Sequence, residues 1–198
     1  MKTILTIILV SCVTVLFSQS DSTKNYFKKI AYGNEFTDGS MYLKKWNRDV
    51  KIFVLGQKDA EMESELLKVV KELNDLINTI NISVVTNKED ANMIVFFGSK
   101  QEFNNFDPSL KTYVENNEGL FKIKHNTSDI YFGEMYVNTK GNLTSNQKKH
   151  LLREELTQSL GLCNDSYRYS KSIFYQGWTD TTEYAEIDKE IIKMLYNN

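Results

Sequence analysis

A strand–helix–strand pattern in the first half of the chain constrains the fold more than any other feature. Residues 49–55 (DVKIFVL) form a β-branched and aromatic run closed by a glycine, which predicts a strand. Over residues 60–80, apolar side chains recur at three- and four-residue spacing, which predicts an amphipathic helix. Residues 82–86 and 92–98 again predict strands, the second apolar enough to be buried on both faces. A strand, a helix and a strand in succession favour parallel pairing through a crossover helix.

The second half of the chain adds two strands and two helices to this pattern. Residues 99–118 predict a loop-rich connection with one helical turn, because polar residues and the only proline interrupt any period. Residues 120–124 and 129–138 predict an antiparallel pair joined by a polar turn. Residues 145–162 and 182–196 predict helices. The predicted fold class is therefore α/β (α+β), with a mixed sheet of about five strands and three main helices.

Composition and length point to one folded domain. The chain has 198 residues, of which 41% are hydrophobic and 12% aromatic, too many for a disordered protein. We expect residues 1–18 to be a signal peptide, residues 19–48 a lead-in that packs on the domain, and residues 49–198 the domain itself. The formal net charge of −2 gives no electrostatic reason to expect a nucleic acid or an anionic membrane as partner.

The first residues have the pattern of an export signal. Lys2 precedes an apolar run over residues 4–17, shorter than the roughly 20 residues that cross a bilayer. We expect cleavage near Ser18 and an exported protein, whether secreted, periplasmic or at the surface. Residues 9–12 (LVSC) are also similar to a lipobox, which would place a lipid anchor on Cys12. We favour cleavage near Ser18 because the apolar run continues past Cys12, and we expect no transmembrane span elsewhere.

One helix carries polar residues in an unusual place. At about 100° per residue, the apolar face of residues 145–162 consists of Leu152, Leu156 and Leu160, and a neighbouring arc consists of Glu154, Glu155 and Gln158. Arg153 and Thr157 point elsewhere. The arc is either an ordinary solvated face or a partly buried cluster, where acids need partners or raised pKa values.

The same helix resembles the zinc-binding helix of the metzincin metalloproteases. Residues 154–165 (EELTQSLGLCND) are similar to the motif HExxHxLGLxxH. Aligned on the shared LGL, the resemblance puts Glu154, Gln158 and Asn164 at the three ligand positions and Glu155 at the position of the general base.

Two further segments extend the metzincin resemblance. Residues 172–175 (SIFY) are similar to the SIMY-like turn beneath the metal, with Phe174 where that turn has methionine. Residues 186–196 resemble the C-terminal helix of matrixin-like members. The resemblance implies a zincin-like fold for residues 49–198.

The sequence is also similar to a bacterial family of secreted and lipoprotein-like proteins, the domain-of-unknown-function family numbered 2927. Its hallmark is an REExTQxLGLxND helix followed by an SIF motif, matched here by residues 153–165 and 172–174. A lead-in that ends at a tryptophan, here Trp46, fits as well. This family has no established activity, so the resemblance implies no function.

The departures from the metzincin motif argue against zinc. Catalytic zinc takes three protein ligands from histidine, cysteine and carboxylate, whereas the ligand positions here hold Glu154, Gln158 and Asn164. We therefore expect no zinc and no other cofactor, although oxygen donors leave a hard cation such as calcium or magnesium as an alternative. In place of a metal we expect a hydrogen-bond network, in which Gln158 and Asn164 donate to Glu154 or Glu155.

Three other residues complete the candidate site. His150 lies one helical turn before Glu154, so it either pairs with that carboxylate or is a surface histidine. Arg153 and Asp165 flank the motif and are kept as further candidates. Cys163 has no histidine near it in the sequence, which favours a small buried residue over a nucleophile.

These observations support one leading function and two alternatives. The leading hypothesis is an exported binding or structural module of the cell envelope, which has lost zinc protease activity and uses its cleft for a peptide or an envelope protein. The first alternative is a peptidase-like hydrolase in which Glu155 is the general base, helped by a non-zinc ion or by Glu154. The second is a cluster that only ties the helix to the following loop. The sequence does not indicate the oligomeric state.

Overall fold

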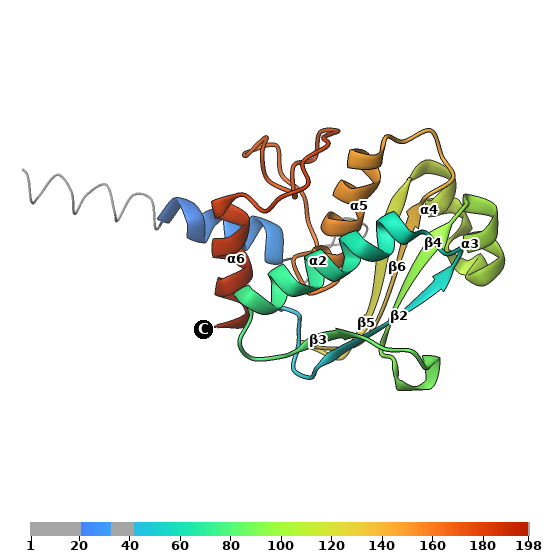
Figure 1. Cartoon of the computed structure of the whole chain (residues 1–198). Coiled ribbons are helices and arrows are strands. Elements are labelled where there is room, and N and C mark those ends of the chain that lie inside the picture. Colours follow the sequence, from blue (N-terminus) through green and yellow to red (C-terminus); the bar gives the residue numbers. More distant parts are fainter. Residues whose placement is uncertain (1–20, 33–41, 198) are drawn as a thin grey trace, which may run out of the picture.

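The computed structural model describes residues 21–32 and 42–197. The predicted signal peptide over residues 1–18 and the lipobox cysteine Cys12 lie outside the described residues. In the described part of the chain, a twisted six-stranded sheet carries helices on both faces (Figure 1). No helix in this part has both the length and the apolar character needed to cross a bilayer.

The elements follow one another in an order close to the predicted one. They are β1 (Lys45–Trp46), β2 (Val50–Gly56), α2 (Ala60–Leu76), β3 (Ile82–Val84), η1 (Lys88–Asp90), β4 (Met93–Gly98), α3 (Lys100–Phe106), η2 (Pro108–Leu110), α4 (Lys111–Asn116), β5 (Gly119–His125), β6 (Asp129–Asn138), α5 (Ser145–Gln158) and α6 (Glu186–Tyr196). Residues 21–31 are also helical. The three main helices are α2, α5 and α6, as the sequence predicts.

The sheet is mixed. Its order is β1-β6-β4-β2-β3, all parallel, and β5 pairs antiparallel with the other edge of β6. The parallel pairing of β2 and β3 through the crossover helix α2 is confirmed, and so is the antiparallel pairing of β5 with β6. β1 is a strand that the sequence analysis did not predict; it lies within the lead-in and pairs with β6.

Alternation along the strands divides the interior into two clusters. In β4, Val95 and Phe97 point into the main core beneath α2, α5 and α6, whereas Phe96 points into a smaller cluster beneath α3 and α4. In β6, Met135 belongs to the main core and Tyr136 to the smaller cluster. All six residues of β4 are buried, which confirms the prediction of a strand covered on both faces.

Three helices are shorter than predicted. α2 ends at Leu76 and not at residue 80, because Ile77 adopts an extended backbone (φ −105°, ψ 128°). α5 ends at Gln158, four residues before the predicted end at residue 162, and a turn follows. α6 begins at Glu186 and not at residue 182. At the start of the helix, the carboxylate of Asp188 accepts a hydrogen bond from the backbone N–H of Ala185 (2.9 Å).

The prediction for residues 99–118 was wrong. This segment holds α3, η2 and α4, not a loop with one helical turn. Ser99 and Glu102 form a capping box at the start of α3, since each side chain accepts a hydrogen bond from the other residue's backbone N–H. Helices of six or seven residues are too short to show a period in the sequence, so this capping box was the available signal.

The lead-in packs on the domain in its described parts, as predicted. Tyr26 and Ile30 of the helical residues 21–31 are buried in the main core. Trp46 in β1 is also buried, and its indole N–H donates to the backbone oxygen of Ser159 just after α5 (3.0 Å). The lead-in thereby fixes the end of the helix that carries the candidate site.

Candidate functional site

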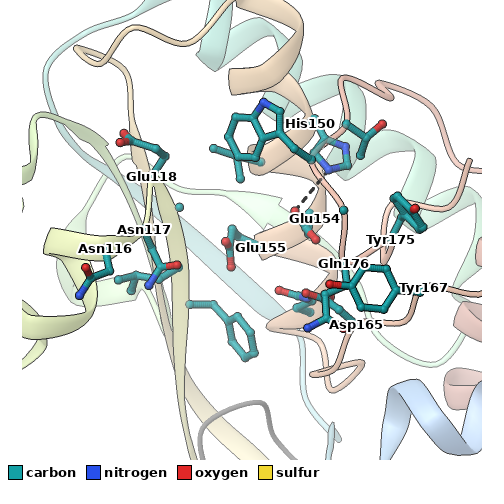
Figure 2. Close-up of a pocket in the computed structure, with 18 residues that line it drawn as sticks. Asn116, Asn117, Glu118, His150, Glu154, Glu155, Asp165, Tyr167, Tyr175 and Gln176 are labelled. Atoms are coloured by element: carbon teal, nitrogen blue, oxygen red, sulfur yellow. Dashed lines mark hydrogen bonds and ion pairs between the residues drawn. The ribbon is translucent and has the colours of Figure 1, made fainter. Parts of the chain in front are cut away.

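A cleft of about 430 Å³ lies between α5, the start of β5 and the irregular segment of residues 165–179 (Figure 2). Its charged and amide side chains are Glu118, Glu154, Glu155, Asp165, His150, Asn116, Asn117, Gln158 and Gln176, and its aromatic ones are Phe121, Tyr167, Tyr175 and Trp178. Among the described residues that line it there is no lysine and no arginine. The cleft is therefore a polar, acidic and aromatic-walled depression.

α5 brings four of the predicted residues, His150, Glu154, Glu155 and Gln158, to this cleft. A capping box of Thr144 and Gln147 starts the helix, and its leucines are buried in the main core. With the leucine face fixed against the core, the neighbouring arc of Glu154, Glu155 and Gln158 turns to the cleft. The geometry therefore excludes an ordinary solvated face, since Glu155 and Gln158 are only 7% and 3% exposed.

Glu155 lies at the centre of the cleft, against the first residue of β5 (Figure 2). A Cβ atom added to Gly119 would stand 2.9 Å from the Glu155 Oε1 atom and 3.2 Å from a Leu151 methyl group. A side chain at this position would have to displace the Glu155 carboxylate or the Leu151 methyl group. The sequence analysis did not single out Gly119.

His150 pairs with Glu154, one of the two alternatives that the sequence left open. Its Nε2 atom lies 3.3 Å from the Glu154 Oε2 atom, and its Nδ1 atom lies 2.8 Å from the carbonyl oxygen of Thr181. The imidazole is 3% exposed, so it is not a surface histidine. Burial alone lowers its pKa, but the hydrogen bond and charge of Glu154 outweigh burial and raise the pKa.

The predicted network around Gln158 and Asn164 was wrong for Asn164. Gln158 donates to Asp165 (Nε2 to Oδ1, 2.6 Å). Asn164 does not line the cleft, and its amide donates to the carbonyl oxygens of Ile30 and Tyr32 (3.2 and 2.9 Å). Asn164 therefore ties the helical segment of residues 21–31 to the domain, whereas Asp165 lines the cleft.

Two other predicted candidates lie away from the cleft. Arg153 is fully buried on the opposite side of α5, where it pairs with Glu65 (3.0 Å) and Glu72 of α2 and lies over the ring of Tyr184. Cys163 is buried as predicted, and burial raises the pKa of its thiol to about 12, which makes it a poor nucleophile at neutral pH.

β5 presents one free edge to the cleft. It pairs only with β6 among the described strands, and its residues 119–121 line the cleft. The backbone N–H of Asn138 donates to the carbonyl oxygen of Glu118, so alternation in an antiparallel pair directs the backbone groups of Gly119 and Phe121 outward. The backbone groups of Gly119, which is buried, and of Phe121, which is half-buried, are thus directed to the cleft side and not to β6.

Exposed aromatic rings form the wall opposite β5. Tyr167 and Trp178 are 70% and 62% exposed, and Tyr167 packs edge-on against Tyr175 at 6.0 Å between ring centroids. The sequence analysis left residues 163–180 as irregular and missed this wall. The available signal was the density of aromatic residues in a polar loop.

A buried network holds the segment that carries this wall. The Ser172 hydroxyl contacts the Tyr26 hydroxyl (2.9 Å), and Asp188 accepts hydrogen bonds from Ser172 (2.5 Å) and from the Ile173 backbone N–H (3.1 Å). Burial raises the pKa of Asp188 to about 6 although these hydrogen bonds favour its charged form. Phe174, which follows in the SIF motif, is fully buried.

The donor set at the metzincin ligand positions does not fit zinc. Glu154 faces His150, Gln158 faces Asp165, and Asn164 is turned to the N-terminal helical segment. In the part of the chain that the structure describes, no group of three or more His, Cys, Asp and Glu side chains is arranged to hold a metal ion. An amide oxygen and a turned-away asparagine cannot supply the three strong ligands that a catalytic zinc requires.

The fold and the cleft define a mixed α/β domain in which α5 and the edge strand β5 enclose an acidic cleft. The chain belongs to the family described as "Protein of unknown function (DUF2927)", whose model matches residues 20–198. The family resemblance predicted from the sequence is therefore confirmed. No curated protein matches the chain.

Two solved structures of myroilysin are similar to this chain. One is 11% identical with a TM-score of 0.47 and covers 77% of this chain and 82% of that chain. Another is 11% identical with a TM-score of 0.48 and covers 86% of this chain and 95% of that chain.

Proposed function

We propose that this protein is an exported peptide-binding module of the cell envelope that has no zinc protease activity. One observation carries the proposal: the cleft and its free strand edge are present, while the side chains at the three metzincin ligand positions are committed to other contacts. A free edge beside a cleft can bind an extended segment through main-chain hydrogen bonds, as in β-strand addition. Export rests on the expected signal peptide over residues 1–18.

A fluorescence measurement tests peptide binding. The chain has two tryptophans, of which Trp46 is buried and Trp178 lies exposed at the cleft. A random octapeptide mixture should change the emission of the wild-type protein but not that of the Trp178→Phe variant, because only the exposed indole reports on the cleft. An unchanged wild-type emission at millimolar peptide would count against the proposal.

A metal analysis tests the absence of zinc chemistry. Protein purified from zinc-supplemented medium should contain far less than one zinc per chain, because the donor set lacks imidazoles. One zinc per chain that is lost in the Gln158→Ala variant would refute this part of the proposal. Peptide turnover that disappears in the Glu155→Gln variant would instead favour the alternative of an active hydrolase.

A further inference from the structure

We infer that the cleft binds an extended segment in which basic residues alternate with apolar ones, added as a strand to the free edge of β5. This inference rests on the proposed function and names the class of peptide. It follows from three properties of the edge: the direction of its backbone groups, the chemistry of the two faces beside it, and the distribution of charge along it.

The backbone sets which peptide residues face α5. A residue paired with Gly119 or Phe121 in an added strand has its side chain on the same face as theirs, because neighbouring strands of a sheet share their pleat. That face is the one covered by α5: Phe121 packs against the main core, and Gly119 lies against Glu155. Gly119 has no side chain, and the Glu155 carboxylate lies where one would stand, so a bound residue opposite Gly119 has this carboxylate beside it.

The two faces beside the edge differ in chemistry. The α5 face offers Glu154 and Glu155, with Asp165 close by (Figure 2). Gln158 also lines this side. On this side a lysine or arginine of the peptide finds carboxylates, with no competing lysine or arginine among the described lining residues. The exposed rings of Tyr167 and Trp178 are also suited to contact a cation.

The opposite face at the same edge is apolar. Leu120 points away from α5 into the cluster beneath α3 and α4. Beside it, a second depression of about 200 Å³ is lined by Leu110 and Tyr113 from the helical connection, together with residues 120–123 and His125 of β5. The peptide residues that alternate with the basic ones point to this side, where an apolar side chain is the better fit.

Charge along β5 fixes the position of the basic residues. Residues 119–121 beside the acidic cleft carry no charge, whereas Lys122 and Lys124 follow further along the strand. The acidic cleft attracts a basic peptide residue at the start of β5, whereas Lys122 and Lys124 lie on the opposite face, where Lys122 pairs with Asp107 (2.6 Å). The basic side chain therefore belongs opposite Gly119, within reach of Glu155.

Three labelled peptides test the inference by fluorescence anisotropy with the purified full chain. The first is Gly-Ser-Val-Arg-Val-Arg-Val-Ser-Gly, the second has glutamates in place of both arginines, and the third, Gly-Ser-Val-Val-Arg-Arg-Val-Ser-Gly, keeps the composition but loses the alternation. We expect the first peptide to bind about tenfold more tightly than the second, because a like charge facing a carboxylate is repelled. We expect the third to bind more weakly than the first, because its arginines point to opposite faces.

Matched variants locate the contact. Glu155→Gln should weaken binding of the alternating peptide about fivefold, as expected for the loss of one charge contact that is partly screened by water. Asp165→Asn is a second variant in case the first disturbs the helix. Glu89→Gln removes an exposed carboxylate in η1, far along the sequence from the cleft, and should change nothing. Two N-methylated forms of the peptide, one modified at the odd-numbered residues and one at the even-numbered residues, should differ. Only the form that loses the main-chain N–H groups facing β5 should no longer bind.

Several outcomes would overturn the inference. Equal affinity for the arginine and glutamate peptides would refute the charge preference while leaving peptide binding intact, so this failure differs from failure of the proposed function. Equal affinity for the alternating and block peptides, or an equal effect of Glu155→Gln and Glu89→Gln, would indicate non-specific attraction. A dimer seen by light scattering that the alternating peptide cannot dissociate would identify a second copy of the chain as the occupant of the edge.

Discussion

Replacement of Glu134 by glutamine tests how the second face of the sheet accommodates a buried carboxyl group. Glu134 in β6 is 7% exposed, and its Oε1 atom has no hydrogen-bond partner. Burial, followed by the nearby charge of Asp107, raises the pKa of Glu134 to about 7. The protonated form is favoured further because it donates a hydrogen bond to Asp107. Asp107 stays ionised: hydrogen bonds from Lys122 and Ser109 outweigh its own burial and lower its pKa to about 2.

The size of the effect follows from the shift. An ordinary glutamate has a pKa of 4.5, so the folded protein holds this proton over a range in which the unfolded chain has lost it. Folding stability from this group therefore falls as pH rises from about 4.5 to about 7, by about 3 kcal/mol in all. Glutamine has nearly the same shape and does not titrate. The free energy of unfolding of Glu134→Gln, relative to wild type, should therefore rise by about 2–3 kcal/mol between pH 4 and pH 8.

Urea unfolding at half-unit pH intervals, followed by tryptophan fluorescence, measures this difference. Taking the difference between variant and wild type at each pH cancels the titration of all other groups. Glu89→Gln, which removes an exposed carboxylate, is the matched control and should show a difference that does not vary with pH. A difference for Glu134→Gln that stays constant within 0.5 kcal/mol over the range (a margin of about a fifth of the expected change) would refute the argument that this carboxyl is held protonated.

Three further substitutions test contacts described above. Arg153→Met should lower the free energy of unfolding by about 3–5 kcal/mol in urea, because it leaves the carboxylates of Glu65 and Glu72 without their buried cation; a loss below about 1 kcal/mol, the value of a surface pair, would contradict this. Gly161→Ala should prevent folding or cost several kcal/mol by the same measurement, since its φ is +118° and a Cβ atom would stand 2.0 Å from a carbonyl oxygen of the lead-in. Asn164→Ala should lower the free energy of unfolding by about 1–3 kcal/mol, and with it the melting temperature. It should also speed proteolysis of the N-terminal helical segment and leave peptide binding unchanged. A loss of peptide binding would contradict the placement of Asn164 outside the cleft.

The larger part of the fold could be predicted because it depends on periods that local sequence reveals. α2 shows its buried face at three- and four-residue spacing, and β4 is an uninterrupted apolar run, so both were found. α3 and α4 were missed because helices this short complete fewer than two turns, and their positions are fixed by the packing of Phe103 and Val114 on the sheet. β1 was missed because two residues carry no period at all.

The candidate site could be predicted only where it lies on a helix. The arc of Glu154, Glu155 and Gln158 follows from geometry that every α-helix shares. Asn164 comes after the turn at Gly161, where the direction of a side chain is set by contacts with residues more than 130 positions earlier, and alignment on a motif does not contain that information. The partners of Arg153 are equally remote, in a helix more than 80 residues earlier.

The free edge of β5 also carries a risk for the protein. Unpaired backbone groups are a template for aggregation, and natural sheets commonly protect such edges with lysines. Lys122 and Lys124 lie in the far half of β5 and protect it in this way, whereas residues 119–121 include no lysine. A gatekeeper lysine there would occupy the position that the cleft needs open. The edge must therefore remain soluble when it is empty and accessible when it binds. A bound segment would itself cover the backbone groups of this half of β5.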